Sequence, residues 1–398
     1  MAKPLQLRPE PSSTSNLTEL RGRYFMRVLF VDVGQGTCQI VLLGEGRAIV
    51  IDAGAHPGVA HRILKLNKIH TIELLAVSHS HVDHAGGAVK NKKNRNNRTA
   101  RSKETCATGI LVDFQESIRQ IGFVQDSNFL KSKFGRYVVK LLNDKKLSEN
   151  QLVRLERTAH YRPLWPTDAT SDSDTVLACV SPTAAGSIVA NSNNNVNAAS
   201  AIIELRHLED RVIFTGDSEY AQWDSLIEHR KANGIDEPIH CVAMSMPHHG
   251  GLMDGSADDL ARFANQTTDA EVVVFSVGTA NGHGHPRSEV ITAMRGSGAH
   301  VICTQITHRC CSSLESVRPS VAGSLTIPCR SSSKPDYNDR YKQKGAKRIR
   351  ARRSRNVACA GSIEARLTDD GIEVLGLEKH SQGVDRLVAD GHEPLCRI

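Results

Sequence analysis

Short runs of Val, Ile, Leu and Phe, separated by glycine-containing turns, dominate the hydrophobic pattern of this 398-residue chain. The runs over 24–33 (YFMRVLFVDV) and 47–51 (RAIVI) predict two β-strands. From 57 to 66 the apolar residues recur at helical spacing behind Pro57, which suits a first helical turn. The apolar run over 74–77 predicts a third strand. The chain therefore opens in the order strand, strand, helix, strand.

In the second half, three of the predicted strands end in a cluster of polar residues. Further β-type runs occupy 175–180, 201–205, 211–215, 240–246 and 271–277, and a closing hairpin is predicted over 361–368 and 371–375. Gly216-Asp217, the PHHGG run over 247–251 and the GTANGHGHP run over 278–286 follow the third, fourth and fifth of these runs. An α/β sandwich places its active site at such strand ends.

Periodicity is weak at both ends of the chain and in two internal stretches. The Pro-, Ser- and Thr-rich residues 1–23 read as a flexible N-terminal arm. One α/β domain is predicted over 24–376, with polar, basic insertions at about 90–173 and 306–357, followed by a C-terminal tail over 377–398. Within the first insertion, Ser148 and Gln151 form a candidate capping box for a helix over 147–159.

The net charge of +7 is concentrated in two segments. Residues 90–103 contain seven Lys or Arg and 342–355 contain eight, with no acidic residue in either. Such runs are typical of solvated loops or of contact with the phosphate backbone of a nucleic acid. Aromatic residues make up only 4% of the chain, which favours backbone contact over base stacking.

Composition also favours a soluble, cytoplasmic protein with no membrane partner. No apolar run is long enough to span a bilayer, and the N-terminus lacks the apolar core of a signal peptide. The ten cysteines have no short regular spacing, so reduced thiols are expected rather than a secreted disulfide scaffold.

The candidate chemistry centres on the loop 78–84 (SHSHVDH), directly after the predicted strand 74–77. His79 and His81 stand two residues apart and project to the same side of extended backbone, so both reach one cation. Asp83 and His84 are adjacent, splay apart and offer an oxygen and a nitrogen to a second cation. The alternative is a solvated histidine-rich turn, which four candidate ligands in six residues make improbable.

Two neighbouring dications repel each other, so they need a shared anionic ligand. Asp217 follows an apolar strand and a glycine, a position from which a short carboxylate reaches between two metals. Taken alone, a Gly-Asp pair is more often the cap of a following helix. With the loop upstream and His248-His249 downstream, a two-metal centre is favoured.

In combination, these motifs resemble the metallo-β-lactamase superfamily. The opening DVGQG (32–36), IDAG (51–54), SHSHVDHAGG (78–87), FTGDS (214–218), PHHGG and GHP are most similar to the hydrolase domain of ComEC-type DNA-uptake proteins and its free-standing relatives. The resemblance implies an αββα sandwich with two divalent cations. It implies that His79 and His81 hold one metal, that Asp83, His84 and His248 hold the other, and that Asp217 bridges them. His249 or His285 would then contact substrate or transfer a proton, although His248 and His249 are interchangeable in this assignment.

The sequence departs from the family pattern at two places. Most two-zinc members have a further histidine before the Gly-Asp pair, whereas residues 195–200 contain none, so water, Asn197 or another side chain would complete the first site. Incomplete, oxygen-rich coordination suits Mn²⁺ as well as Zn²⁺. Thr37 stands where the ComEC-type opening has an aspartate. The expected chemistry is hydrolysis by a metal-activated water, with Asp83 as a ligand that also orients it.

Cysteines gather around the second insertion. Cys303, Cys310, Cys311 and Cys359 are candidates for a structural zinc that would staple this stretch, although buried free thiols, which need no metal, are the more frequent outcome.

Three functions follow from these observations. The leading one is a phosphodiesterase or nuclease whose basic segments guide nucleic acid toward the metal site. This function also allows for a protein partner. The second is hydrolysis of a small ester, thioester, lactam or cyclic nucleotide, since one fold hosts many chemistries. The third is a non-catalytic binding or regulatory subunit that kept the fold.

Overall fold

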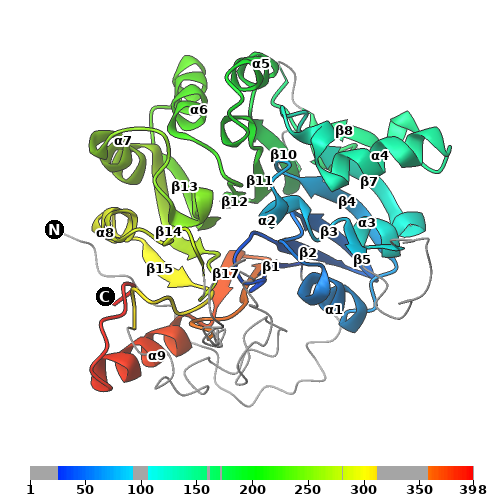
Figure 1. Ribbon diagram of the computed structural model, residues 1–398. Coiled ribbons are helices and arrows are strands. Elements are labelled where there is room, and N and C mark those ends of the chain that lie inside the picture. Colours follow the sequence, from blue (N-terminus) through cyan, green and yellow to red (C-terminus); the bar gives the residue numbers. More distant parts are fainter. Residues whose placement is uncertain are drawn as a thin grey trace, which may run out of the picture.

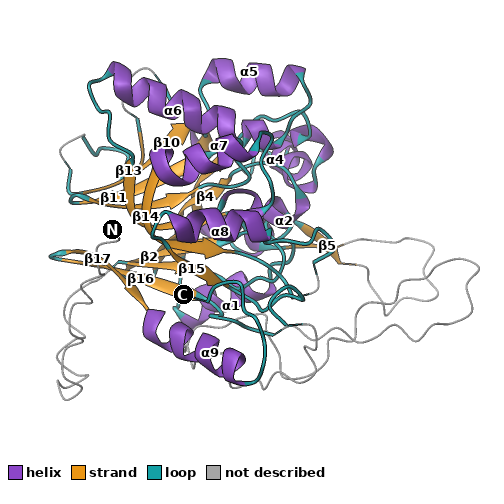
Figure 2. Cartoon of the chain, turned by 90° about the vertical axis from the view of Figure 1, so that its left-hand side faces the viewer, coloured by secondary structure: helices purple, strands orange, loops and turns teal. Residues whose placement is uncertain are grey.

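Two β-sheets face each other, and helices cover the outer face of each (Figures 1 and 2). This arrangement comes from a computed structural model that describes residues 26–92, 106–158, 162–170, 173–279, 281–311 and 357–397. The αββα sandwich predicted from the sequence is confirmed.

The first sheet has eight strands in the order β17-β16-β1-β2-β3-β4-β7-β8. Its strands are β1 (Arg27–Phe30), β2 (Gln39–Gly44), β3 (Arg47–Ile51), β4 (Thr71–Val77), β7 (Ile118–Phe123), β8 (Leu152–Arg154), β16 (Ile363–Thr368) and β17 (Gly371–Leu375). The β16–β17 hairpin pairs with β1, so the predicted closing hairpin extends this sheet.

The second sheet has seven strands in the order β15-β14-β13-β12-β11-β10-β9. Its strands are β9 (Pro163–Trp165), β10 (Thr175–Ser181), β11 (Ile202–His207), β12 (Asp210–Phe214), β13 (Ile239–Ser245), β14 (Thr268–Phe275) and β15 (His300–Cys303). The four strands from β12 to β15 are parallel, which brings their carboxyl ends to one edge of the sheet.

Alternation along the strands divides the apolar residues among three layers of core. On β1, Val28 and Phe30 belong to the layer between the sheets, where Phe30 lies 6.0 Å from Phe214 of β12, ring centroid to centroid. Leu29 on the same strand faces the opposite way and joins the layer under the outer helices. Because both faces of the sheet are buried, these strands read as continuous apolar runs.

The helices lie over the two outer layers. Over the first sheet lie α1 (Gly58–Leu66), α3 (Ile110–Asp113) and α4 (Lys133–Asn143), and over the second lie α6 (Tyr220–Ala232), α7 (Ala257–Arg262), α8 (Ser288–Gly296) and α9 (Leu377–Ala389). Two further helices are α2 (Val82–Ala85) and α5 (Ala184–Ser192), and a two-stranded ladder joins β5 (Lys90–Lys92) to β6 (Cys106–Thr108).

The sequence suggested that the stretch 90–173 is an insertion outside the core, but in the structure it is part of the core. It supplies β7 and β8 to the first sheet and β9 to the second, and its side chains join the buried layer under α4. β7 (IRQIGF) was missed because charged and polar residues interrupt its apolar pattern. The predicted helix over 147–159 is also wrong: the Ser148–Gln151 capping box is present, but it closes a single 3₁₀ turn, Glu149–Gln151, that runs straight into β8.

The predicted C-terminal tail is likewise part of the folded domain, because Val384 and Leu387 of α9 pack into the same core layer as α6 and α8. The N-terminal arm, most of the basic segment 90–103, all of the basic segment 342–355 and most of the second insertion lie outside the described residues. None of the helices in the described ranges combines the length and apolar character that crossing a membrane requires.

Candidate metal centre

The polar clusters of the sequence meet at one end of the two sheets. The loop bearing His79 follows β4 of the first sheet, Asp217 follows β12, and His249 follows β13 of the second sheet. β12 and β13 run parallel, so their carboxyl ends lie side by side and bring Asp217 and His249 to the same edge. The centre is thus built from both halves of the sandwich.

Three buried side chains form the inner part of the centre. The ligand atoms of His79, His84 and Asp217 all lie within 4.8 Å of one another. His84 Nε2 lies 3.0 Å from Asp217 Oδ1, and His79 Nε2 lies 3.6 Å from Asp217 Oδ2.

A second group overlaps the first and opens toward solvent. Asp83, His84 and His249 also have ligand atoms within 4.8 Å of one another. His249 Nε2 lies 3.4 Å from Asp83 Oδ2 and 3.6 Å from Asp217 Oδ1. Asp217 therefore turns one oxygen toward His79 and the other toward His84 and His249.

The residues present fit a cationic group. His79 Nε2, His84 Nε2, His249 Nε2 and Asp217 Oδ1 are buried and lack a hydrogen bond of good geometry. Each buried polar atom left in this state costs about 1–3 kcal/mol, and four of them converge on one small volume. Imidazole nitrogens and carboxylate oxygens are the ligands that Zn²⁺, Mn²⁺ and iron accept.

Outer contacts fix the orientation of the rings. His84 Nδ1 donates to Asp52 Oδ2 at 2.7 Å, and Asp52 also accepts the Ser78 backbone N–H (2.7 Å) and hydroxyl (2.8 Å). His249 Nδ1 donates to the carbonyl of Ser276 at 2.9 Å. Both contacts leave Nε2 facing the centre, as in metal sites where a carboxylate or carbonyl orients a ligating histidine. Asp52 was not among the predicted site residues, although it directly follows a buried strand.

Electrostatics reflect this crowding of charge. Burial lowers the pKa of His84, but Asp217 and Asp52 outweigh it and hold the pKa well above its usual value. Burial raises the pKa of Asp217, but His84 and His249 hold it well below its usual range. Burial and His84 hold the pKa of His79 well below its usual value, because this ring has a weaker carboxylate contact.

The backbone is bent sharply around the centre. Gly216 has φ +52°, and a Cβ there would stand 2.3 Å from the Ser200 hydroxyl, so only glycine fits before Asp217. His248 and His249 both adopt left-handed backbone, with φ 51° and 55°. Such a conformation costs a non-glycine residue about 1–3 kcal/mol and is concentrated at functional sites.

This bend decides which of the two adjacent histidines reaches the centre. His249 is buried between Asp83 and Asp217, whereas His248 lies outside both groups with its Nδ1 3.9 Å from Glu219 Oε1. The preference for His248 as the ligand is therefore reversed by the geometry. No local pattern separates two neighbouring histidines; only the backbone conformation does.

The remaining predicted residues surround the centre. His81 caps α2, and its ring lies 4.8 Å from that of His79, outside both groups. His285 is buried beside His248 and His249, with ring centroids 5.5 and 6.4 Å away. Burial and these two rings lower the pKa of His285 to about 4.

The two departures from the expected pattern also have structural counterparts. Ser200, in the stretch without a histidine, places its hydroxyl 3.2 Å from His79 Nδ1 and accepts the Asp217 N–H at 3.0 Å. Asn197 instead contacts Glu219. Thr37 places its hydroxyl 3.4 Å from His249 Nδ1, on the outer side of that ring.

A four-layer αββα sandwich with buried histidines and carboxylates at its strand ends defines an α/β domain with a candidate metal centre. Residues 31–173 match the family model described as "Metallo-beta-lactamase superfamily". Over these residues the chain is therefore similar to the metallo-β-lactamase superfamily, which supports a metal-dependent hydrolase. The match spans β2 to β9 and includes the region first read as an insertion.

Similarity to individual proteins is low. No curated protein sequence matches the chain. The solved structure "Tm1679, a metal-dependent hydrolase of the beta-lactamase superfamily" is 14% identical, with a TM-score of 0.36, and the match covers 70% of this chain and 95% of that one. The structure "CmlA, a diiron beta-hydroxylase from Streptomyces venezuelae" is 13% identical, with a TM-score of 0.37, over 70% of this chain. This chain spans about half the length of the latter (52%). Scores this low indicate nothing about activity.

Proposed function

We propose that this protein is a two-metal phosphodiesterase that cleaves nucleic acid. The observation that carries the proposal is the position of Asp217, whose two oxygens face His79 on one side and His84 and His249 on the other. A carboxylate held between two sets of unpaired ring nitrogens is the arrangement that a pair of bridged cations requires.

The ligand sets follow from this geometry. His79 would hold the first metal, together with His81 once the His81 side chain rotates toward it. Asp83, His84 and His249 would hold the second metal. Asp217 would bridge them. Nitrogen and oxygen ligands without sulfur suit Zn²⁺ or Mn²⁺, and a diiron pair uses the same ligand types.

When bound, such cations make a neighbouring water acidic and stabilise the negative charge that develops on a phosphoryl group. Asp83 lies at the open side, where its carboxylate can also orient the attacking water. His285, whose pKa is about 4 because of burial, is neutral at pH 7 and can donate a ring N–H to the substrate. His248, half-exposed beside it, is placed to contact substrate rather than metal.

The choice of nucleic acid rests on charge. The basic segment 90–103 begins six residues after His84, and its first three residues form β5, which pairs with β6 (Cys106–Thr108). Residues at the end of this ladder return to the metal loop, with Ile110 N–H donating to the Gly87 carbonyl at 3.1 Å. A cationic segment anchored beside the centre would draw a polyanion toward it.

Cytoplasmic location and a protein partner remain predictions.

The test compares substrates on one enzyme preparation. Protein loaded with Zn²⁺ or Mn²⁺ is assayed on bis-p-nitrophenyl phosphate and single-stranded DNA, and separately on nitrocefin and a thioester. We expect cleavage of the first pair, and its loss in Asp217→Ala. Cleavage of only the second pair would assign the alternative, hydrolysis of a small ester or lactam. Absence of bound metal and of all activity would indicate the third function, a non-catalytic binding or regulatory subunit.

A second measurement tests the basic segment. Replacing Lys93, Arg95 and Arg98 by Gln should weaken DNA binding and flatten its dependence on salt, because each lost phosphate contact removes counterion release. The matched control replaces the exposed Lys145 and Lys146 beyond α4. Equal salt dependence in both variants and the wild type would rule out this segment as the DNA contact, while the rate on bis-p-nitrophenyl phosphate should not change in either.

A further inference from the structure

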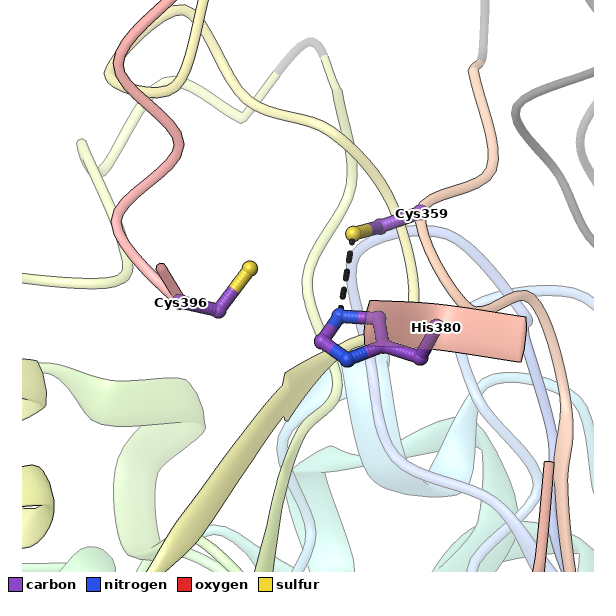
Figure 3. A group of neighbouring side chains, drawn as sticks. All are labelled: Cys359, His380 and Cys396. Carbon is purple, nitrogen blue, oxygen red and sulfur yellow. Dashed lines mark hydrogen bonds between the residues drawn. The ribbon is translucent and has the colours of Figure 1, made fainter. Parts of the chain in front are cut away.

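A second cluster of metal-type ligands lies away from the strand-end centre and contains sulfur. Cys359, His380 and Cys396 have ligand atoms within 4.8 Å of one another (Figure 3). Cys359 precedes β16, His380 lies in the first turn of α9, and Cys396 lies close to the C-terminus. Figure 3 shows the Cys359 sulfur turned toward the His380 ring and the Cys396 sulfur facing the space between the three side chains.

The distance from the Cys359 sulfur to the His380 ring is that of a zinc site. Cys359 Sγ lies 3.5 Å from His380 Nε2. Tetrahedral coordination with Zn–S of about 2.3 Å and Zn–N of about 2.05 Å places sulfur and nitrogen about 3.6 Å apart. The three side chains are between 3% and 6% exposed, so the position between them is closed to water. Structural zinc sites are closed in this way, whereas catalytic sites keep an open position.

Cys303 is the candidate fourth ligand, and it lies outside the group whose ligand atoms are all within 4.8 Å of one another. It ends β15 and is fully buried, and its carbonyl accepts the N–H of Ala360, the residue after Cys359, at 3.0 Å. Burial and the nearby Cys396 and Cys310 raise the pKa of its thiol. Cys310 has another polar neighbour, the Thr307 hydroxyl, 3.8 Å from its sulfur.

We propose that Cys303, Cys359, His380 and Cys396 hold a structural zinc ion that fastens the C-terminal helix α9 to the end of β15. Only two of the four cysteines predicted from the sequence, Cys303 and Cys359, belong to this set. Cys311 instead lies 3.4 Å from His392 Nδ1. His380 and Cys396 were missed because they lie in the segment read as a tail.

Such an ion would join three stretches that the chain separates widely. Residues 312–356 lie between Cys311 and Val357. The chain shortly before that stretch contacts the chain directly after it, because the Ile306 N–H donates to the Val357 carbonyl at 2.8 Å. A zinc ion beside this contact would tie both ends of the stretch to the C-terminus. Metal binding of this kind contributes directly to folding free energy.

Cobalt substitution of the full-length protein tests the proposal. Co²⁺ bound to thiolate gives an intense charge-transfer absorption in the near ultraviolet, and the strand-end centre contains no sulfur ligand to produce it. We expect this band in the wild type at one equivalent, unchanged in Asp217→Ala and lost in Cys359→Ser and Cys396→Ser. The matched control is Cys241→Ser, a buried free cysteine of β13. Cys303→Ser should weaken the band.

X-ray absorption of zinc-loaded wild-type protein gives an independent readout that needs no variant. We expect sulfur scatterers at about 2.3 Å from part of the zinc. The proposal is overturned by a wild type that gives no thiolate band and no zinc–sulfur scattering. It is equally overturned by a Cys359–Cys396 disulfide in protein purified with metal, or by a band that survives in both Cys359→Ser and Cys396→Ser.

Discussion

The strand-end centre and the cysteine cluster differ in ligand chemistry and in access to water. The first uses only nitrogen and oxygen atoms, and its outer residues Asp83 and His248 have side chains that are 31% and 28% exposed. The second uses sulfur and nitrogen, and no side chain of its three core members is more than 6% exposed. Hard or borderline ligands around an open position suit catalysis, and soft ligands in a closed one suit structure.

The two clusters also differ in how their ligands are supported. At the strand-end centre, Asp52 and the Ser276 carbonyl hold the outer nitrogens of His84 and His249, so the rings stay oriented without a metal. In the cysteine cluster, the outer nitrogen of His380, Nδ1, is buried without a hydrogen-bond partner. A site whose histidine rings are already oriented keeps its geometry while a water or substrate ligand exchanges at the metal. In the cysteine cluster, the bound zinc ion would itself have to orient the His380 ring.

The largest effect is expected from Asp217→Ala. Loss of the proposed bridging carboxylate would leave two cations unshielded from each other, so metal content at the strand-end centre should fall and hydrolysis should drop by at least about 10³-fold. Metal analysis beside a rate measurement on bis-p-nitrophenyl phosphate checks this. Full activity with unchanged metal content in this variant would show that the strand-end centre is not the catalytic metal site.

A smaller but sharper contrast is expected between two adjacent histidines. His249→Ala should reduce the rate by more than about 100-fold and remove metal, because this ring lies between Asp83 and Asp217. His248→Ala should keep the metal and affect mainly KM, since its ring points to Glu219 and His285. Rate constants and bound metal measured in both variants decide between them, and the reverse ranking would restore the assignment made from the sequence.

Asp52→Asn should weaken metal binding about 10- to 100-fold without removing a ligand. The substitution keeps the shape of the side chain but loses the charge that faces His84 Nδ1. Titration of the metal-free protein with Zn²⁺ measures the affinity. If excess metal restores the wild-type rate, Asp52 acts by positioning; an affinity equal to that of the wild type would contradict this role.

The smallest effect on catalysis is expected from Cys396→Ser. Each strand-end metal should still be bound, and the rate per bound metal should match the wild type. The Tm should fall on the order of 5 °C, because a closed metal site contributes to stability. Thermal unfolding and kinetics on the same sample separate the two effects, and a loss of rate larger than the loss of folded protein would link the two clusters.

Sequence patterns predicted many strands of the sandwich from continuous apolar runs, but they missed the apolar strands β2 and β15. The strands β3, β4 and β13 are buried on both faces, so burial alone makes them visible as apolar runs. β7 and β8 escaped notice because polar residues interrupt them, and their place is set by pairing with β4 rather than by their own pattern. The helix predicted over 147–159 failed because a capping box marks the start of a turn and says nothing of its length.

The sequence by itself identified the loop over 78–84 as the candidate metal-binding loop, and three of its four predicted ligands, His79, Asp83 and His84, lie in the two ligand groups. His79, His81, Asp83 and His84 lie within six residues, where the strand end and the following turn alone fix how the side chains diverge. Tertiary structure decided the rest. It chose His249 over His248 through two left-handed residues, placed Asp52 behind His84, and joined Cys359 to His380 and Cys396. Local spacing carries local geometry, whereas contacts between distant residues depend on how whole layers pack.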